Sequence, residues 1–80
     1  MTISPNPAVT DVNASIISAG DCDAEWQIID MAGRVLLKNF VSLKKGKNQL
    51  SINMSQLASG SYYLQIKGAC IDLKDKFQKL

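Results

Sequence analysis

The sequence predicts an all-β domain, an antiparallel sandwich of six or seven short strands. Apolar and polar residues alternate in several short runs, with turn signals between them at intervals of about eight to twelve residues. No segment shows the helical period of about 3.6 residues. The 80 residues, with 46% hydrophobic and 20% charged side chains, suit one small globular domain spanning residues 1–80.

The clearest strand signal lies in residues 57–66. A polar turn ends at Gly60, after which Tyr62, Leu64 and Ile66 alternate with mostly polar residues. This is the period of a half-buried strand. Gly60 is expected to have a structural role in the turn.

The remaining strands are predicted from the same alternation, at residues 11–18, 24–30, 35–41, 49–55 and 70–80. Before them, Ser4-Pro5-Asn6-Pro7 favours extended backbone, because each proline fixes φ. Residues 31–33 are predicted to form a tight hairpin turn, with Gly33 free to take positive φ. In the last strand Asp75 interrupts an apolar face, which predicts a bulge or a loss of burial there.

Cys22 and Cys70 are the only cysteines, and their meaning depends on the redox compartment. In a reducing compartment they are two idle thiols. If successive strands alternate in direction, the connections at residues 19–23, 43–48 and 68–69 fall at one end of the sandwich. Both cysteines then lie at that end, which favours a Cys22–Cys70 disulfide in an oxidising compartment.

Neither composition nor motif points to catalysis. The sequence contains no histidine, the commonest general base and metal ligand, and a cysteine nucleophile lacks that base as well. Asp21, Asp23 and Glu25 alternate as calcium ligands do, but they lack the glycine and the distant glutamate of the known calcium loop. We interpret them as a solvated turn. We therefore expect no enzyme activity, no cofactor, no metal and no small-molecule substrate.

The charge pattern argues against nucleic acid as a partner. The net charge is only +2, and Arg34 is the only arginine. Lys44, Lys45 and Lys47 form a short basic turn that is typical of a solvated loop.

An alternative function is a secreted adhesive or carbohydrate-binding sandwich. Trp26, Tyr62 and Tyr63 suit a sugar platform only if they share an exposed face. The alternation places Trp26 and Tyr62 inside and Tyr63 outside, which favours a core role for the first two.

The chain shows no export or membrane signal of its own. No apolar run approaches the roughly 20 residues of a membrane span, and the first residues lack the basic and apolar parts of a signal peptide. The chain is either cytoplasmic or a piece of a longer exported protein, and we favour the second.

Four short motifs then identify a family. They are Ser4-Pro5-Asn6-Pro7, Asp30-Met31-Ala32-Gly33-Arg34-Val35, Leu57-Ala58-Ser59-Gly60-Ser61-Tyr62 and Lys76-Phe77-Gln78-Lys79. In this order, over nearly the whole chain, they resemble the type A C-terminal sorting domain of the type IX secretion system. That family shows a Pro-Asn-Pro start, an Asp-x-x-Gly-Lys/Arg hairpin, a Leu-x-x-Gly-x-Tyr turn and a lysine-rich last strand.

The resemblance implies an Ig-like sandwich of about seven strands at the C-terminus of a larger secreted cargo protein. Such a domain is a non-catalytic address, read by the outer-membrane translocon and its shuttle proteins. It passes through the periplasm with its N-terminal cargo, which then reaches the cell surface or the extracellular space. A sortase-like peptidase normally removes the domain by a cut before its first strand, here upstream of or near Ser4.

The resemblance also implies that recognition lies in the last strand. Lys76, Phe77, Lys79 and Leu80 align with the terminal motif of the family, and Lys74 lies on the same stretch. If this strand is at a sheet edge, its lysines also block unwanted strand pairing.

Other positions carry over differently. Gly33 and Gly60 match the family as structural turn residues. Cys22 and Cys70 are not part of the family pattern, so the disulfide is an expectation for this chain alone. Leu80 stands where many relatives end in a polar or basic residue.

Overall fold

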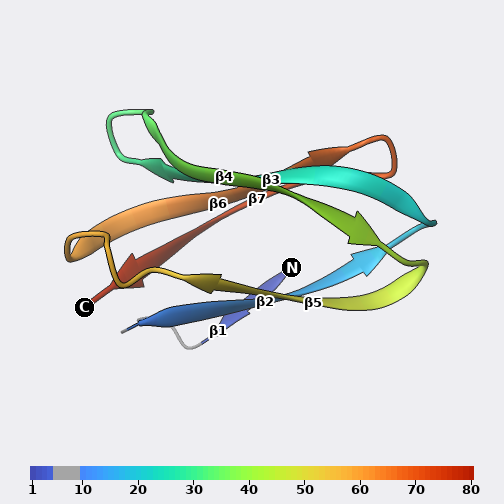
Figure 1. The fold of residues 1–80 in the computed structure, drawn as a ribbon, viewed down its shortest axis with the longest axis horizontal. Coiled ribbons are helices and arrows are strands. Elements are labelled where there is room, and N and C mark those ends of the chain that lie inside the picture. Colours follow the sequence, from blue (N-terminus) through green and yellow to red (C-terminus); the bar gives the residue numbers. More distant parts are fainter. Residues whose placement is uncertain (5–9) are drawn as a thin grey trace.

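The computed structural model describes residues 1–4 and 10–80, and this part of the chain forms two antiparallel sheets packed face to face (Figure 1). Its seven strands are β1 (Thr2–Ser4), β2 (Asp11–Ser18), β3 (Cys22–Asp30), β4 (Val35–Leu43), β5 (Gly46–Asn53), β6 (Gly60–Gly68) and β7 (Ile71–Lys79). One sheet has the order β1-β2-β5 and the other β4-β3-β6-β7. The predicted all-β, Ig-like sandwich is confirmed.

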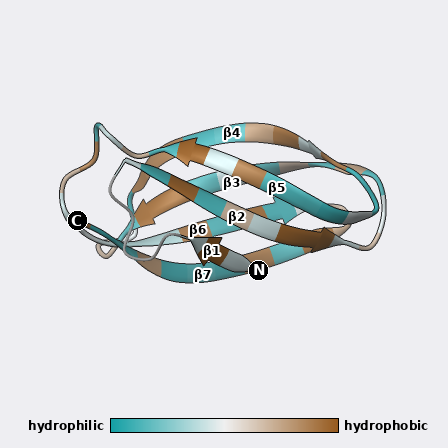
Figure 2. Ribbon diagram, turned by 90° about the horizontal axis from the view of Figure 1, so that it is seen from below, coloured by the Kyte–Doolittle hydropathy of each residue, from teal (hydrophilic) through white to brown (hydrophobic). Residues whose placement is uncertain are grey.

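The core lies between the two sheets, because alternate residues of each strand point inward. Figure 2 shows this alternation as changes between hydrophilic and hydrophobic segments along the strands. The small sheet contributes Val12, Ala14, Ile16 and Ile52 to the core, and the large sheet contributes Ala24, Ile28, Tyr62, Leu64, Ile66, Ile71 and Phe77. The predicted inward faces of β2, β5 and β6 are therefore correct.

Several strands are longer than the alternation predicts. β3 begins at Cys22, and the basic turn predicted at residues 43–48 shortens to Lys44 and Lys45. The cause is strand pairing, since Cys22 pairs with Leu43 and Ser18 pairs with Gly46 beyond the alternating runs. The residues 5–7 of the predicted extended opening lie outside the described residues.

The irregular pairing lies between β3 and β4, not near Asp75. The β3–β4 register shifts between Ile28 and Ile29, which leaves Leu36 of β4 without a cross-strand partner. β7 pairs with β6 along its whole length without a shift. Asp75 is exposed, so the loss of burial predicted there occurs without a bulge. An edge strand allows this, because its free side is open to water.

Three connections meet at one end of the sandwich, as the alternation of strand directions predicts (Figure 1). They are the β2–β3, β4–β5 and β6–β7 loops, and we call this the disulfide end. The β3–β4 and β5–β6 turns lie at the other end together with the C-terminus, and we call this the hairpin end. The disulfide end and the hairpin end of the sandwich therefore carry different loops.

A substitution at Gly68 tests how closely β6 approaches its paired strand β3. A methyl group at this position would lie 2.6 Å from the Asp23 carbonyl oxygen and 2.9 Å from the Ala24 Cβ. We expect Gly68→Ala to lower the free energy of unfolding by about 1–3 kcal/mol, because the backbone must move to admit the methyl group. Urea unfolding measures this change.

Gly20→Ala is the matched control for this substitution. No heavy atom lies within 4 Å of a Cβ at position 20. Its expected effect is within about 0.5 kcal/mol of the parent protein. Equal losses for the two variants would contradict the packing argument.

Candidate recognition surface

β7 is an edge strand of the four-stranded sheet, and among the strands of residues 1–4 and 10–80 it pairs with β6 alone. Its residues alternate between the core and the solvent, with Ile71 and Phe77 buried and Lys74 and Lys76 exposed. The strand thus presents lysines on the outer face of the sheet and along a free edge. A partner protein can reach both without opening the fold.

Phe77 holds this strand in place. Its side chain is only 1% exposed, and its ring centroid lies 6.1 Å from that of Tyr62. Tyr62 is the cross-strand partner of Phe77, so the two aromatic rings share the core face of β6 and β7. A partner cannot touch Phe77 in the folded domain. Within the terminal motif it is therefore an anchor.

The outer face of β7 carries two lysines beside one aromatic ring. The Lys74 Nζ lies 4.7 Å from the centroid of the Tyr63 ring, within the range of a cation–π interaction. Lys76 is directly opposite Tyr63 in the β6–β7 register. The position of Tyr63 outside the core agrees with the sequence prediction. Its contact with Lys74 was not predicted, because the pairing register is set only in the sheet.

The last two residues end the strand and leave it. Lys79 is half-buried, opposite Gly60, and its Nζ donates a hydrogen bond to the Leu80 carbonyl oxygen at 3.3 Å. The Leu80 side chain is 65% exposed. The structure therefore separates the five predicted recognition residues into two exposed lysines, one half-buried lysine, a core anchor and an exposed apolar end.

The Asp-x-x-Gly-Arg motif builds the β3–β4 turn. Asp30 Oδ1 accepts hydrogen bonds from the backbone N–H groups of Ala32 at 3.0 Å and Arg34 at 2.9 Å. Its Oδ2 lies 2.9 Å from Arg34 Nε. Gly33 has φ +88°, a conformation that residues with a Cβ rarely adopt, and it closes the turn. Each position of the motif therefore has a structural reason.

The backbone hydrogen bond from Arg34 lowers the pKa of Asp30, and the Arg34 side chain and the Ala32 N–H act in the same direction. These donors all favour the charged carboxylate. Because the folded pKa is below the unfolded one, the stabilisation is present above the unfolded value and is lost as the pH falls through the folded pKa.

The Leu-x-x-Gly-x-Tyr motif builds the turn that precedes β6. The Leu57 N–H donates to the Met54 carbonyl at 3.0 Å, and the Tyr62 hydroxyl donates to the Ala58 carbonyl at 2.5 Å. Gly60 has φ +154° at the start of β6. The motif therefore ties the turn to Tyr62, the same tyrosine that packs beside Phe77. Through this contact on the core side, the turn helps to position edge strand β7.

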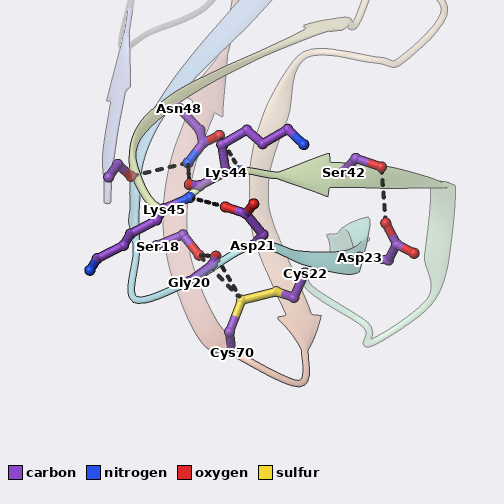
Figure 3. Close-up of a disulfide and its surroundings, with 11 residues drawn as sticks. Ser18, Gly20, Asp21, Cys22, Asp23, Ser42, Lys44, Lys45, Asn48 and Cys70 are labelled. Carbon is purple, nitrogen blue, oxygen red and sulfur yellow. Dashed lines mark hydrogen bonds between the residues drawn. A yellow bond between two sulfur atoms is a disulfide. The ribbon is translucent and has the colours of Figure 1, made fainter.

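At the disulfide end, a covalent bond joins β3 to the β6–β7 turn of the large sheet. Cys22 at the start of β3 and Cys70 in the β6–β7 turn form a disulfide, with their Cα atoms 6.2 Å apart (Figure 3). Ser18 is buried beside it, and its hydroxyl lies 3.2 Å from the Cys70 sulfur and 2.6 Å from the Gly20 carbonyl. This link fixes the start of β7 against β3.

The three carboxylates considered for calcium bind different groups of the protein. Asp21 accepts from the Lys45 N–H at 2.7 Å, Asp23 accepts from the Ser42 hydroxyl at 2.9 Å, and Glu25 accepts from the Gln27 amide at 2.8 Å (Figure 3 for the first two). In residues 1–4 and 10–80, no group of three or more metal-ligating side chains occurs.

The aromatic residues do not share one exposed face. Tyr62 is buried, and Trp26 is half-buried against the core. Tyr63 lies on the opposite, outer face of the sheet. The platform that the carbohydrate-binding alternative requires is therefore not assembled by these three side chains.

These observations define a class of protein, a small antiparallel β-sandwich whose last strand is a sheet edge with exposed lysines. The chain matches the family model for the secretion system C-terminal sorting domain over residues 2–79, essentially its whole length, and it belongs to this family, which serves type IX secretion. Family membership implies export to the cell surface or the extracellular space. No curated protein matches the chain. Within the described residues, no helix is long and apolar enough to cross a membrane.

The Asp30 charge makes a pH-dependent contribution that Asp30→Asn tests. At about pH 7 the variant is expected to be less stable than the parent, because it keeps the side-chain oxygen but loses the charge. This difference is expected to shrink as the pH falls from the ordinary aspartate pKa of about 3.9 through the lowered pKa of folded Asp30, where the parent carboxylate also becomes neutral. Urea unfolding over this pH range measures the difference, and a constant gap would contradict the argument.

The disulfide is tested by a thiol count and by its removal. The folded, non-reduced protein is expected to show no titratable thiol. The double variant Cys22→Ser with Cys70→Ser is expected to lower the free energy of unfolding by about 2–4 kcal/mol. Two titratable thiols in the folded protein would exclude the link. Mild reduction of the parent serves as the control for the two serine substitutions, since it breaks the same bond without changing the sequence.

Proposed function

We propose that residues 1–80 form a single, non-catalytic C-terminal sorting signal that directs a larger cargo protein to the type IX translocon. Membership of the sorting-domain family supports this proposal. The single structural observation that carries it is the edge strand β7, which is anchored by buried Phe77 and presents Lys74, Lys76 and Leu80 to solvent. Such a surface suits recognition by another protein rather than catalysis.

The proposed route has three stages. A signal peptide of the cargo takes the precursor across the inner membrane, and the sandwich folds in the periplasm. Shuttle and translocon proteins bind the domain and move the cargo through the outer membrane. A sortase-like peptidase then cuts upstream of or near Ser4, and the cargo is released or stays at the cell surface. An oxidising periplasm agrees with the Cys22–Cys70 disulfide.

The chemistry of β7 explains why it is suited to recognition. The exposed lysines supply positive charge at fixed positions on a rigid strand, which gives a partner both attraction and register. Asp75 points to the inner side of an edge strand, and charges so placed oppose pairing with other strands. The edge is thus available to a specific partner while it resists aggregation with other chains.

The function is tested by fusing residues 1–80 to a folded reporter that carries a signal peptide, in a host with a type IX system. We expect the reporter in the medium or on the cell surface with the domain, and in the periplasm without it. An intact fusion that stays in the periplasm would refute the proposed function. Detection of a cut near Ser4 in the exported reporter would support the peptidase step.

The recognition end is tested by charge reversal. Lys74→Glu with Lys76→Glu is expected to lower the exported fraction about tenfold or more, because the charge of the outer face of β7 is inverted. Lys44→Glu with Lys45→Glu is the matched control, since it makes the same charge change in an exposed turn at the disulfide end. Equal export of both variants would remove β7 from recognition and leave the sorting function standing.

A further inference from the structure

The outer face of the four-stranded sheet is organised in rows that cross the strands. The row nearest the hairpin end, which we call the apolar row, runs through Val35, Ile29, Tyr63 and Lys76. The next, which we call the lysine row, runs through Lys38, Gln27, Gln65 and Lys74. In the described part of the chain no other strand is stacked on this face. Both rows begin on edge strand β4 and end on edge strand β7.

Charge divides this face into two halves. The apolar and lysine rows contain three lysines and no carboxylate. The rows nearer the disulfide end run through Phe40, Glu25, Lys67 and Asp72, and through Ser42 and Asp23. These contain three carboxylates and one lysine. The hairpin half is therefore basic and the disulfide half acidic, so the two halves attract opposite partners.

The basic half also has a hollow at the β4 edge. The register shift between Ile28 and Ile29 leaves Leu36 as an extra residue, and a shallow hollow opens there, lined by Gln27, Val35, Leu36, Leu37 and Lys38. Val35 is 47% exposed and Leu36 is 38% exposed. Bulges of this kind redirect side chains at sheet edges and are common beside binding sites. Here the bulge places two apolar side chains next to a lysine.

We propose that the apolar row and the lysine row together dock an extended acidic segment of a partner protein, with one apolar anchor residue in the hollow at Leu36. This inference rests on the proposed function and extends the recognition end from β7 across the sheet to β4. Lys38, Lys74 and Lys76 attract the carboxylates of the segment, and Lys74 is already drawn toward the apolar row by Tyr63. The hollow lined by Val35 and Leu36 takes the apolar anchor.

A partner protein fits this surface better than a lipid bilayer. Ile29 is only 9% exposed, so the floor of the apolar row is recessed and cannot insert into a bilayer. Two copies of this face in one orientation would set lysines against lysines. In the opposite orientation the lysines of one copy would face Glu25 and Asp72 of the other, and the sedimentation measurement below distinguishes that arrangement from a partner protein. On edge strand β4, moreover, the Asn39 side chain accepts the Phe40 N–H at 2.8 Å and so occupies a backbone donor.

The first test uses the exported reporter fusion. Val35→Ser with Leu36→Ser is expected to lower export about tenfold or more, with thermal unfolding of the isolated domain measured alongside. Phe40→Ser is the matched control, because Phe40 is 75% exposed on the same strand but lies in the acidic half. Export of the double variant at the parent level overturns this inference. An equal loss of export in the double variant and in Phe40→Ser also overturns it. If the intact fusion is not exported, the proposed function itself is refuted.

The second test identifies the occupant on the isolated, isotope-labelled domain. The probe is a panel of ten-residue peptides that alternate Leu or Phe with Asp or Glu, and the matched control replaces the acids by Lys. We expect NMR shift changes confined to the two rows, weakened by salt and reduced about tenfold in affinity by Val35→Ser with Leu36→Ser.

The remaining outcomes of this test decide against the proposal. Shifts with vesicles of anionic phospholipid and none with the acidic peptides would assign the surface to a membrane. A dimer in sedimentation analysis that the double serine variant dissociates would assign it to a second copy. No shift with any acidic peptide would overturn the assignment of an acidic segment.

Discussion

The burial of Phe77 beside Tyr62 is the interaction that holds edge strand β7 and its exposed lysines in place. An edge strand has a partner on one side only, so its position is set by the side chains that it sends into the core. Phe77 is the largest fully buried residue of the described chain, and its partner Tyr62 is tied to the preceding turn by its hydroxyl. The Leu-x-x-Gly-x-Tyr turn and the last strand therefore act as one unit, which holds the exposed lysines at fixed positions.

The disulfide end and the hairpin end of the sandwich are stabilised in different ways. At the disulfide end, Cys22–Cys70 joins the start of β3 to the turn before β7, and the Asp21 carboxylate binds the Lys45 N–H across neighbouring loops. At the hairpin end, the turns are closed by short-range hydrogen bonds such as those of Asp30. The disulfide end is therefore reinforced by long-range links, whereas the β3–β4 turn at the hairpin end is closed by local ones.

A sorting signal that travels attached to a folded cargo has to avoid pairing with other strands while it stays readable. Inward-pointing Asp75 and the lysines of β7 oppose strand addition at one edge, and the Asn39 side chain occupies a backbone donor at the other. Under the proposed function, specific recognition falls to side chains on the outer face. This explains why charge and apolar surface are concentrated on rows across the sheet rather than in a cleft.

The fold class, the inward faces of β2, β5 and β6, and both turn motifs are predicted from the sequence alone. Period-2 alternation and turn chemistry depend on neighbouring residues, so they can be read locally. Strand ends at Cys22 and Gly46 were missed because pairing with another strand extends them. Val35, Leu36 and Leu37 are consecutive apolar residues without a period of two, which is a local sign of the bulge on β4. The pairing of Phe77 with Tyr62, the position of Lys74 over Tyr63 and the gathering of residues from four strands into the apolar and lysine rows depend on the tertiary structure, because register and sheet order bring together residues far apart in the chain.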